Sequence, residues 1–301
     1  LGNQLLITPL LQEVIATFPN AKIDLFVKGN LAPVLFKNYD HIGRIIKLPK
    51  KPFKHLIQYA QVWLAIKRKS YDLVINVDKN SSSGRLATKF SRSRYKFYED
   101  GNEGLPIKNS DYLHIAKYPV LSFRNHLSQL GMDRSEKPIP SMDIKLSKAE
   151  ILKGSGILKD TVGTEKPTIC LFTYATGKKR FSEAWWEEFH ARLKSEYKNH
   201  PIIEVLPAEN VSQIKFTEPT FYSRDVREIA SVIENTSIFI GADSGIMHLA
   251  NATTTPTFGL FSVTKSDKYE PYGNNSRSLD TREMDLNGIF REMDKILKSS
   301  E

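Results

Sequence analysis

The chain has 301 residues, 40% of them hydrophobic and 26% charged, which is typical of a globular protein. Its 16 Gly and 15 Pro are close to average usage, which excludes a fibrous or disordered chain. The 43 Lys+Arg against 34 Asp+Glu give a net charge of +9, which indicates an anionic partner: nucleic acid, a phosphorylated ligand or an acidic membrane surface.

The single cysteine, Cys170, excludes an internal disulfide framework and a multi-cysteine metal site. It lies in the apolar run at residues 168–172, so we expect a small buried hydrophobe rather than a nucleophile. No apolar stretch reaches the roughly 18 residues that span a bilayer, and no secretory signal is visible. We therefore expect a cytoplasmic protein.

Helical and strand-like patterns alternate along the first half of the chain. Residues 1–5 read as a loop entering a helix, so we expect a first strand to precede Leu1. Helices are predicted at residues 8–18, 31–38, 53–69, after 81–84 and at 114–130, and strands at 21–27, 42–48 and 71–78. This alternation predicts right-handed βαβ units with parallel strands.

The second half repeats the alternation more clearly. Strands are predicted at residues 168–173, 202–206, 237–242 and 257–261, and helices at 146–158, 182–197, 226–235, 245–252 and 286–298. Two α/β domains follow, with a boundary between Gly131 and Pro167. We assign residues 1–150 to an N-terminal and residues 151–301 to a C-terminal Rossmann-like domain, with a last helix that could pack back on the former.

The segment at residues 238–262 carries the clearest chemical pattern. An apolar strand runs into Asp243, Ser244 and Gly245, and a helix begins there. Ligands bind at the carboxyl ends of strands in open α/β sheets, and the N–H groups of a helix start attract phosphate. Ser244 can cap the helix, Gly245 permits close backbone approach, and His248 shares the face of Ser244. An ordinary capped helix with a surface histidine is the alternative.

Two further turns precede predicted helices. Residues 178–180 are three consecutive cations after the strand at 168–173, and they suit a pyrophosphate; a solvated basic turn is the alternative. Ser182 is the predicted N-cap of the following helix. The Gly-led turn at residues 1–9 opens the first helix, and it would face an interdomain cleft if the two sheets present their carboxyl ends to each other.

These segments together resemble a known family. Gly2 followed by LLITPLL, the KKRFSE stretch with its tryptophan at residues 178–186, and GADSGIMHLA at 241–250 are similar to the ADP-heptose:lipopolysaccharide heptosyltransferases of glycosyltransferase family 9. The resemblance implies a GT-B fold, with two facing Rossmann-like domains and a nucleotide-sugar in their cleft. It also implies an inverting, metal-independent transfer of a heptose or related sugar from a nucleoside diphosphate, here ADP-heptose, to a lipopolysaccharide core or similar glycan.

The resemblance also assigns roles to individual residues. Lys179 corresponds to the diphosphate-binding lysine, Asp243 to the acid near the nucleotide ribose, and Glu209 to an acid that contacts the donor sugar or nucleotide. The phosphate-side turn comprises Ser244, Gly245 and His248. Thr173 and Thr176 adjoin Tyr174 and Ala175, which stand where the family has hydroxyl residues. No metal and no bound cofactor are implied, and the absence of an Asp-x-Asp triplet agrees with this.

The chain departs from the family at Asn3, where the family has the aspartate that is the candidate general base. An amide cannot take the proton of an acceptor hydroxyl at neutral pH. Three explanations stay open: an inactivating change at Asn3, another carboxylate such as Asp78 as the base, or a catalytically silent protein that binds a nucleotide-sugar without efficient transfer.

The expected partners are a nucleotide-sugar donor and a phosphorylated glycolipid or oligosaccharide acceptor. The cations beyond residues 178–180 suit an anionic membrane surface, which would make the protein peripheral at the inner face of the inner membrane. A nicotinamide-dependent oxidoreductase is disfavoured because no Gly-x-Gly-x-x-Gly follows a strand. Nucleic-acid binding is disfavoured because the basic runs are scattered and match no recognised module.

Overall fold

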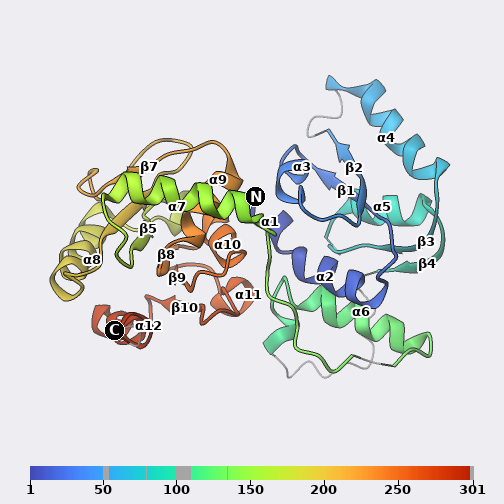
Figure 1. Ribbon diagram of the computed structural model, residues 1–301. Helices are drawn as coiled ribbons and strands as arrows, with labels where there is room; N and C mark the ends of the chain where they lie inside the picture. The colour runs from blue at the N-terminus through green and yellow to red at the C-terminus, as the bar shows by residue number, and fades with distance from the viewer. Residues whose placement is uncertain (50–53, 79, 99–109, 134, 299–301) are drawn as a thin grey trace. The chain divides into compact units, whose positions relative to one another are not determined.

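The computed structural model describes residues 1–49, 54–78, 80–98, 110–133 and 135–298. The chain forms two compact units (Figure 1). One, the C-terminal unit, consists of Leu1–Leu6 with Ser141–Glu301; the other, the N-terminal unit, is Ile7–Pro140. Each is an α/β structure with parallel strands, as the alternation of elements predicts.

The C-terminal unit is built on a six-stranded sheet in the order β10-β9-β8-β5-β6-β7, in which all neighbours pair in parallel. Its strands are β5 (Ile169–Phe172), β6 (Ile202–Val205), β7 (Thr220–Phe221), β8 (Ile238–Ala242), β9 (Thr257–Phe261) and β10 (Arg277–Asp280). Every residue of β5, β6, β8 and β9 is buried, which explains their apolar sequences. The chain runs from β5 to β6 and β7 on one side and returns to β8 on the other.

Helices and aromatic side chains complete this unit. Its helices are α1 (Gly2–Leu5), α7 (Lys148–Val162), α8 (Glu183–Glu196), α9 (Val226–Glu234), α10 (Gly245–Asn251), α11 (Ser266–Tyr269) and α12 (Leu286–Leu297), with a 3₁₀ turn at Gly177–Lys179. The core beside the sheet contains Trp186 and Phe189 of α8 and Phe290 of α12. The ring centroid of Phe189 lies 5.6 Å from that of Trp186 and 5.3 Å from that of Phe290. Cys170 is fully buried in β5, and burial raises the pKa of its thiol.

The N-terminal unit contains two parallel strand pairs among its described residues: β1 (Ile23–Lys28) with β2 (Ile42–Leu48), and β3 (Ser70–Ile75) with β4 (Arg92–Phe97). Its helices are α2 (Thr8–Thr17), α3 (Ala32–Leu35), α4 (Leu56–Arg68), α5 (Ser82–Phe90) and α6 (Tyr118–Gln129), with a 3₁₀ turn at Ser110–Tyr112. The sequence did not predict β4, whose RSRYKF run alternates cations with small or aromatic residues, nor the short elements β7, β10 and α11.

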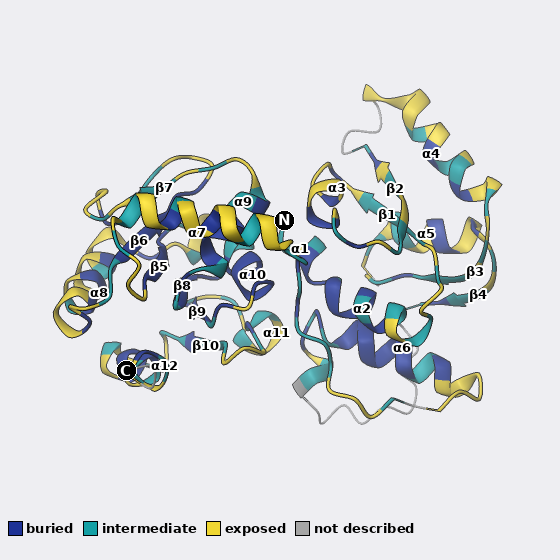
Figure 2. Cartoon of the chain, viewed as in Figure 1, coloured by how far each residue is buried: buried dark blue, intermediate teal, exposed yellow. Residues whose placement is uncertain are grey.

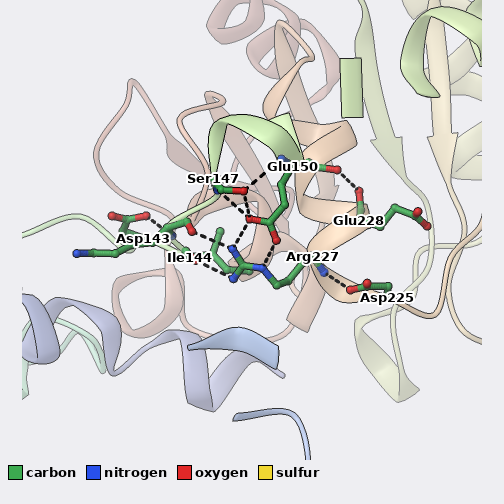
Figure 3. A network of polar contacts seen from close by, with 9 residues as sticks. Asp143, Ile144, Ser147, Glu150, Asp225, Arg227 and Glu228 are labelled. Atoms are coloured by element: carbon green, nitrogen blue, oxygen red, sulfur yellow. Dashed lines mark hydrogen bonds and ion pairs between the residues drawn. The ribbon is translucent and has the colours of Figure 1, made fainter. Parts of the chain in front are cut away.

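A buried arginine ties residues 141–150 to the C-terminal unit (Figure 3). Arg227 of α9 is 4% exposed; its Nε and Nη2 donate to the Glu150 carboxylate at 2.6 and 2.9 Å, and it also donates to the carbonyls of Ile144 and Lys145. Ser147 and Glu150 form the capping box that begins α7. The two units divide between residues 140 and 141.

Helices α7 and α9 pack closely because Gly154 has no side chain. A Cβ at this position would lie 2.1 Å from the carbonyl oxygen of Ser231, whereas a Cβ at Gly156 would meet nothing within 4 Å. The two glycines therefore have different roles, although they stand two residues apart in one helix.

We expect Gly154→Ala to lower the free energy of unfolding by about 1–3 kcal/mol, because the clash is with backbone that cannot rotate away. Gly156→Ala, the matched control, should raise it by about 0.5–1 kcal/mol through its better helix propensity. Urea unfolding of both variants checks this, and equal effects would contradict the packing role of Gly154.

The Glu150–Arg227 pair makes stability depend on pH. The hydrogen bonds from Arg227 hold the pKa of Glu150 well below its ordinary value. The pair's contribution to the free energy of unfolding is therefore complete above about pH 5 and is lost as the pH falls. We expect Glu150→Gln to cost about 1.5–3 kcal/mol at pH 7, and this difference from the wild type to narrow between about pH 5 and pH 3. Urea unfolding at several pH values measures it.

Glu165→Gln is the control, because Glu165 is exposed and pairs with exposed Lys159. It should have little effect at any pH. If the loss of unfolding free energy in Glu150→Gln stays constant from pH 7 to pH 3, the ion pair is not the source of that loss.

Candidate functional site

The turns after β5 and β8 bring a lysine and an aspartate together at the carboxyl edge of the sheet. Lys179 Nζ lies 2.7 Å from Asp243 Oδ2; the lysine side chain is 36% exposed and the aspartate 4%. The Thr264 hydroxyl donates to the same aspartate oxygen, and the Tyr269 ring centroid lies 5.9 Å from Lys179 Nζ. Because the strand order reverses between β5 and β8, this pair lies at the switch point of the sheet, the position at which open α/β sheets bind ligands.

The turn that contains Asp243 leads directly into α10. Ser244 is the N-cap of this helix, as predicted, and its hydroxyl accepts a hydrogen bond from the backbone N–H of Met247 at 3.2 Å. The Asp243 backbone N–H donates to the carbonyl of Leu260 in β9, which holds the turn against the sheet edge.

Helix α1 packs against α10 through two glycines. A Cβ at Gly2 would lie 3.0 Å from His248 Cδ2, and one at Gly245 would lie 3.3 Å from Leu1 Cβ. His248 is only 5% exposed, and its ring centroid lies 6.4 Å from that of Tyr269, so it is not the surface histidine of the alternative. Asn3 is exposed on α1, next to Gly2.

Thr173, at the end of β5, is part of a buried polar cluster. Its hydroxyl donates to Glu204 Oε1 at 2.6 Å and accepts from the backbone N–H of Gln213 at 3.1 Å. Ser212 donates to the other Glu204 oxygen. Burial raises the pKa of Glu204, and these two hydroxyl donors oppose that shift. At 1% exposure, Thr173 contributes its hydroxyl to the fold.

The remaining predicted residues lie on exposed turns at the same edge. Thr176 precedes the 3₁₀ turn that carries Lys179, and Glu209 is on the loop after β6, which Ser212 and Glu204 hold in place. The turn after β5 is fixed by Arg180, which donates to the carbonyl of Ala175 at 3.0 Å. Thr176 and Glu209 thus follow neighbouring strands but form no hydrogen bond to each other among the described contacts.

Thr264 and Tyr269 were not predicted. Both follow β9, which does appear in the sequence as an apolar run. The rule that parallel strands end at one edge would have directed attention to residues 262–269. Asp78, the alternative base, is an exposed residue of the N-terminal unit whose Oδ1 accepts from the Asn80 backbone N–H at 2.9 Å.

Two searches of the described residues gave negative results. Within residues 1–298, apart from the gaps given above, no three His, Cys, Asp or Glu side chains come close enough to hold a metal ion. Over the same part of the chain, every helix is too short or too polar to cross a membrane.

Comparison with known proteins gives one family match and one curated relative. Residues 224–290, which include Asp243, Ser244, Gly245 and His248, match the family described as "Glycosyltransferase family 9 (heptosyltransferase)". The chain is 26% identical over 291 residues to lipopolysaccharide heptosyltransferase 3 of Escherichia coli, with 91% of this chain and 84% of the relative covered.

Solved structures share the fold. A family 9 glycosyl transferase from Veillonella parvula matches with a TM-score of 0.72 at 17% identity, covering 99% of this chain and 88% of the other. E. coli heptosyltransferase WaaC with ADP matches at 0.71 and 16%, covering 98% and 96%. E. coli ADP-heptose lps heptosyltransferase II matches at 0.69 and 15%, covering 99% and 96%.

The predicted GT-B fold is therefore confirmed. The turn that begins α10 lies inside the family match, and the relative covers nearly the whole chain. The resemblance inferred from the three sequence segments is confirmed as well, since residues 224–290 match glycosyltransferase family 9 (heptosyltransferase).

Proposed function

We propose that the protein transfers a heptose or related sugar from a nucleoside diphosphate donor, ADP-heptose, to a lipopolysaccharide core or similar glycan. The observation that carries the proposal is the Lys179–Asp243 pair at the switch point of the sheet, inside a fold that this chain shares with a heptosyltransferase solved with ADP. The names of the relatives supply the sugar and the acceptor class.

Lys179 is suited to bind the donor diphosphate. Its ammonium group stands at the carboxyl edge and is partly exposed, while Asp243 is buried and accepts from both Lys179 and Thr264. Asp243 therefore holds the lysine side chain in position, and its buried carboxylate is not available to cations in the solvent. As the sugar–oxygen bond breaks, negative charge grows on the departing diphosphate, and a fixed cation lowers the energy of that transition state.

The transfer we propose is inverting and independent of a metal. The acceptor oxygen attacks the anomeric carbon opposite the departing diphosphate, and its proton goes to a base on the acceptor side. Lys179 supplies the positive charge that a divalent cation supplies in metal-dependent transferases. Asn3 stands where the family has its candidate base, and its amide cannot take this proton.

We expect Lys179→Ala to weaken ADP binding by about 10–100-fold and to reduce transfer by about 100–1,000-fold, because a transition-state charge loses its partner. Lys179→Arg should retain part of both. Calorimetry with ADP, and a radiolabelled ADP-heptose assay with delipidated core oligosaccharide, measure the two quantities.

Lys178→Ala is the matched control, since Lys178 is the neighbouring exposed cation in the same turn. It should change ADP affinity only slightly. If Lys178→Ala and Lys179→Ala weaken binding equally, the turn acts through its net charge, and the specific role of Lys179 is wrong.

We expect Asn3→Asp to raise kcat by about 10–100-fold, with a rise in activity as the pH passes through the carboxylate pKa. The side chain is exposed, so the exchange leaves packing intact. Asn3→Ala should leave the rate of the natural chain unchanged. The pH–rate profile of each variant in the same assay checks this.

Measurable transfer that does not respond to Asn3→Asp would mean that the natural chain uses another base. Asp78→Asn then tests the remaining candidate, because loss of transfer in that variant assigns the proton to Asp78. Transfer absent from every variant, with ADP binding intact, would contradict the proposed activity.

A further inference from the structure

Helix α4 of the N-terminal unit has two apolar faces. Val62 and Ile66 are buried in a small cluster with Leu48 and Ala87, and this face anchors the helix. The other face carries Leu56, Ile57 and Leu64, which are 63%, 78% and 49% exposed. Because residues seven and eight positions apart share a helix face, these three form one exposed stripe.

Helix α5 extends this stripe. Leu86 and Phe90, four residues apart on α5, are 44% and 48% exposed, and α5 packs against α4. Lys67 of α4 connects the two, since its ammonium nitrogen lies 5.8 Å from the centroid of the Phe90 ring. We call these five apolar residues, together with the cations of residues 54–70 and 80–98, the α4–α5 surface; Figure 2 shows that both helices carry exposed segments.

The two stretches of chain that carry these residues have charges of one sign. Residues 54–70 and 80–98 contain no Asp or Glu. The same two stretches contain the cations Lys54, Lys67, Arg68, Lys69, Arg85, Lys89, Arg92, Arg94 and Lys96. Lys69 is engaged with Asp24, but Lys67, Arg68, Arg85, Lys89, Arg92 and Arg94 are exposed.

We propose that the α4–α5 surface docks on an anionic lipid bilayer. A contiguous patch of large exposed apolar side chains on a globular protein marks an interaction site. An apolar stripe bordered by Lys and Arg without acids fits the boundary between acyl chains and phosphate headgroups, where the apolar groups insert and the cations pair with phosphate. This surface would hold the protein at the membrane that carries a glycolipid acceptor.

Charge and side-chain type together favour a bilayer over other partners. A nucleic acid would use the cations but leave Ile57 and Leu64 exposed to water. A second copy of this surface would bring like charges together across the interface, which is unfavourable. A lipid bilayer with anionic headgroups satisfies both the apolar stripe and the cations at once.

The test is vesicle co-sedimentation of the full chain at about 0.1 M salt, with phosphatidylcholine vesicles that contain about one third phosphatidylglycerol, against phosphatidylcholine alone. We expect binding to the anionic vesicles only. Ile57→Glu with Leu64→Glu should reduce it at least tenfold, and Lys67→Ala with Arg68→Ala should reduce it by about fivefold per cation.

Leu152→Glu is the matched control, because Leu152 is 73% exposed on α7 of the other unit. It should bind like the wild type. Thermal unfolding verifies that each variant is folded. Because the substituted side chains are exposed, we expect their melting temperatures to stay close to that of the wild type.

A label at residue 57 reports insertion directly. Ile57→Cys can be labelled selectively with an environment-sensitive dye, since Cys170 is fully buried. The dye emission should shift to the blue with anionic vesicles, and the same dye on Leu152→Cys should not shift.

Several results would overturn the proposal. These are equal binding to neutral vesicles, wild-type binding by Ile57→Glu with Leu64→Glu, no dye shift, or a concentration-dependent dimer that this double variant abolishes. Retention of RNA or DNA by the surface in preference to anionic vesicles would overturn it too. Transfer to delipidated oligosaccharide should be unaffected by the surface variants, so the outcome is independent of the proposed activity.

Discussion

The parallel pairing of β5 with β8 determines where the candidate site residues lie. Phe172 pairs with Gly241, so the two strands end almost level, and the turns that follow leave the sheet edge side by side. Lys179 reaches Asp243 only because its turn and that of Asp243 leave in the same direction. Antiparallel pairing at this position would put them at opposite edges, a full strand apart.

The sequence predicted this part of the site because its signals are local. Four buried strands appear as apolar runs, and three of them, β5, β8 and β9, are followed at once by a polar residue, which locates the carboxyl edge. The same rule directs attention to residues 262–269 after β9, but it does not single out Thr264 and Tyr269, since nothing local distinguishes them from other polar and aromatic residues after a strand. Their relation to Lys179 and Asp243 exists only after β9 has paired with β8.

Glu204 illustrates the other kind of information that the sequence lacks. One carboxylate inside an apolar strand is costly to bury, and it is tolerated because Thr173 and Ser212 donate to its two oxygens. These three residues are up to 39 positions apart, so no window along the chain connects them. The same contacts link the end of β5 to the loop that carries Glu209. The shape of that loop therefore depends on Glu204, which lies within β6 rather than in the loop.

The position of Asn3 is set by backbone packing rather than by its side chain. Gly2 and Gly245 let α1 approach α10, and His248 fills the space beneath Gly2. Because the side chain at position 3 is exposed to solvent, the fold tolerates either an amide or a carboxylate there. The difference between the two affects whether this side chain can accept a proton and does not affect the fold. Helix α1 belongs to the same compact unit as Lys179, so the side chain at position 3 and Lys179 are held by one fold.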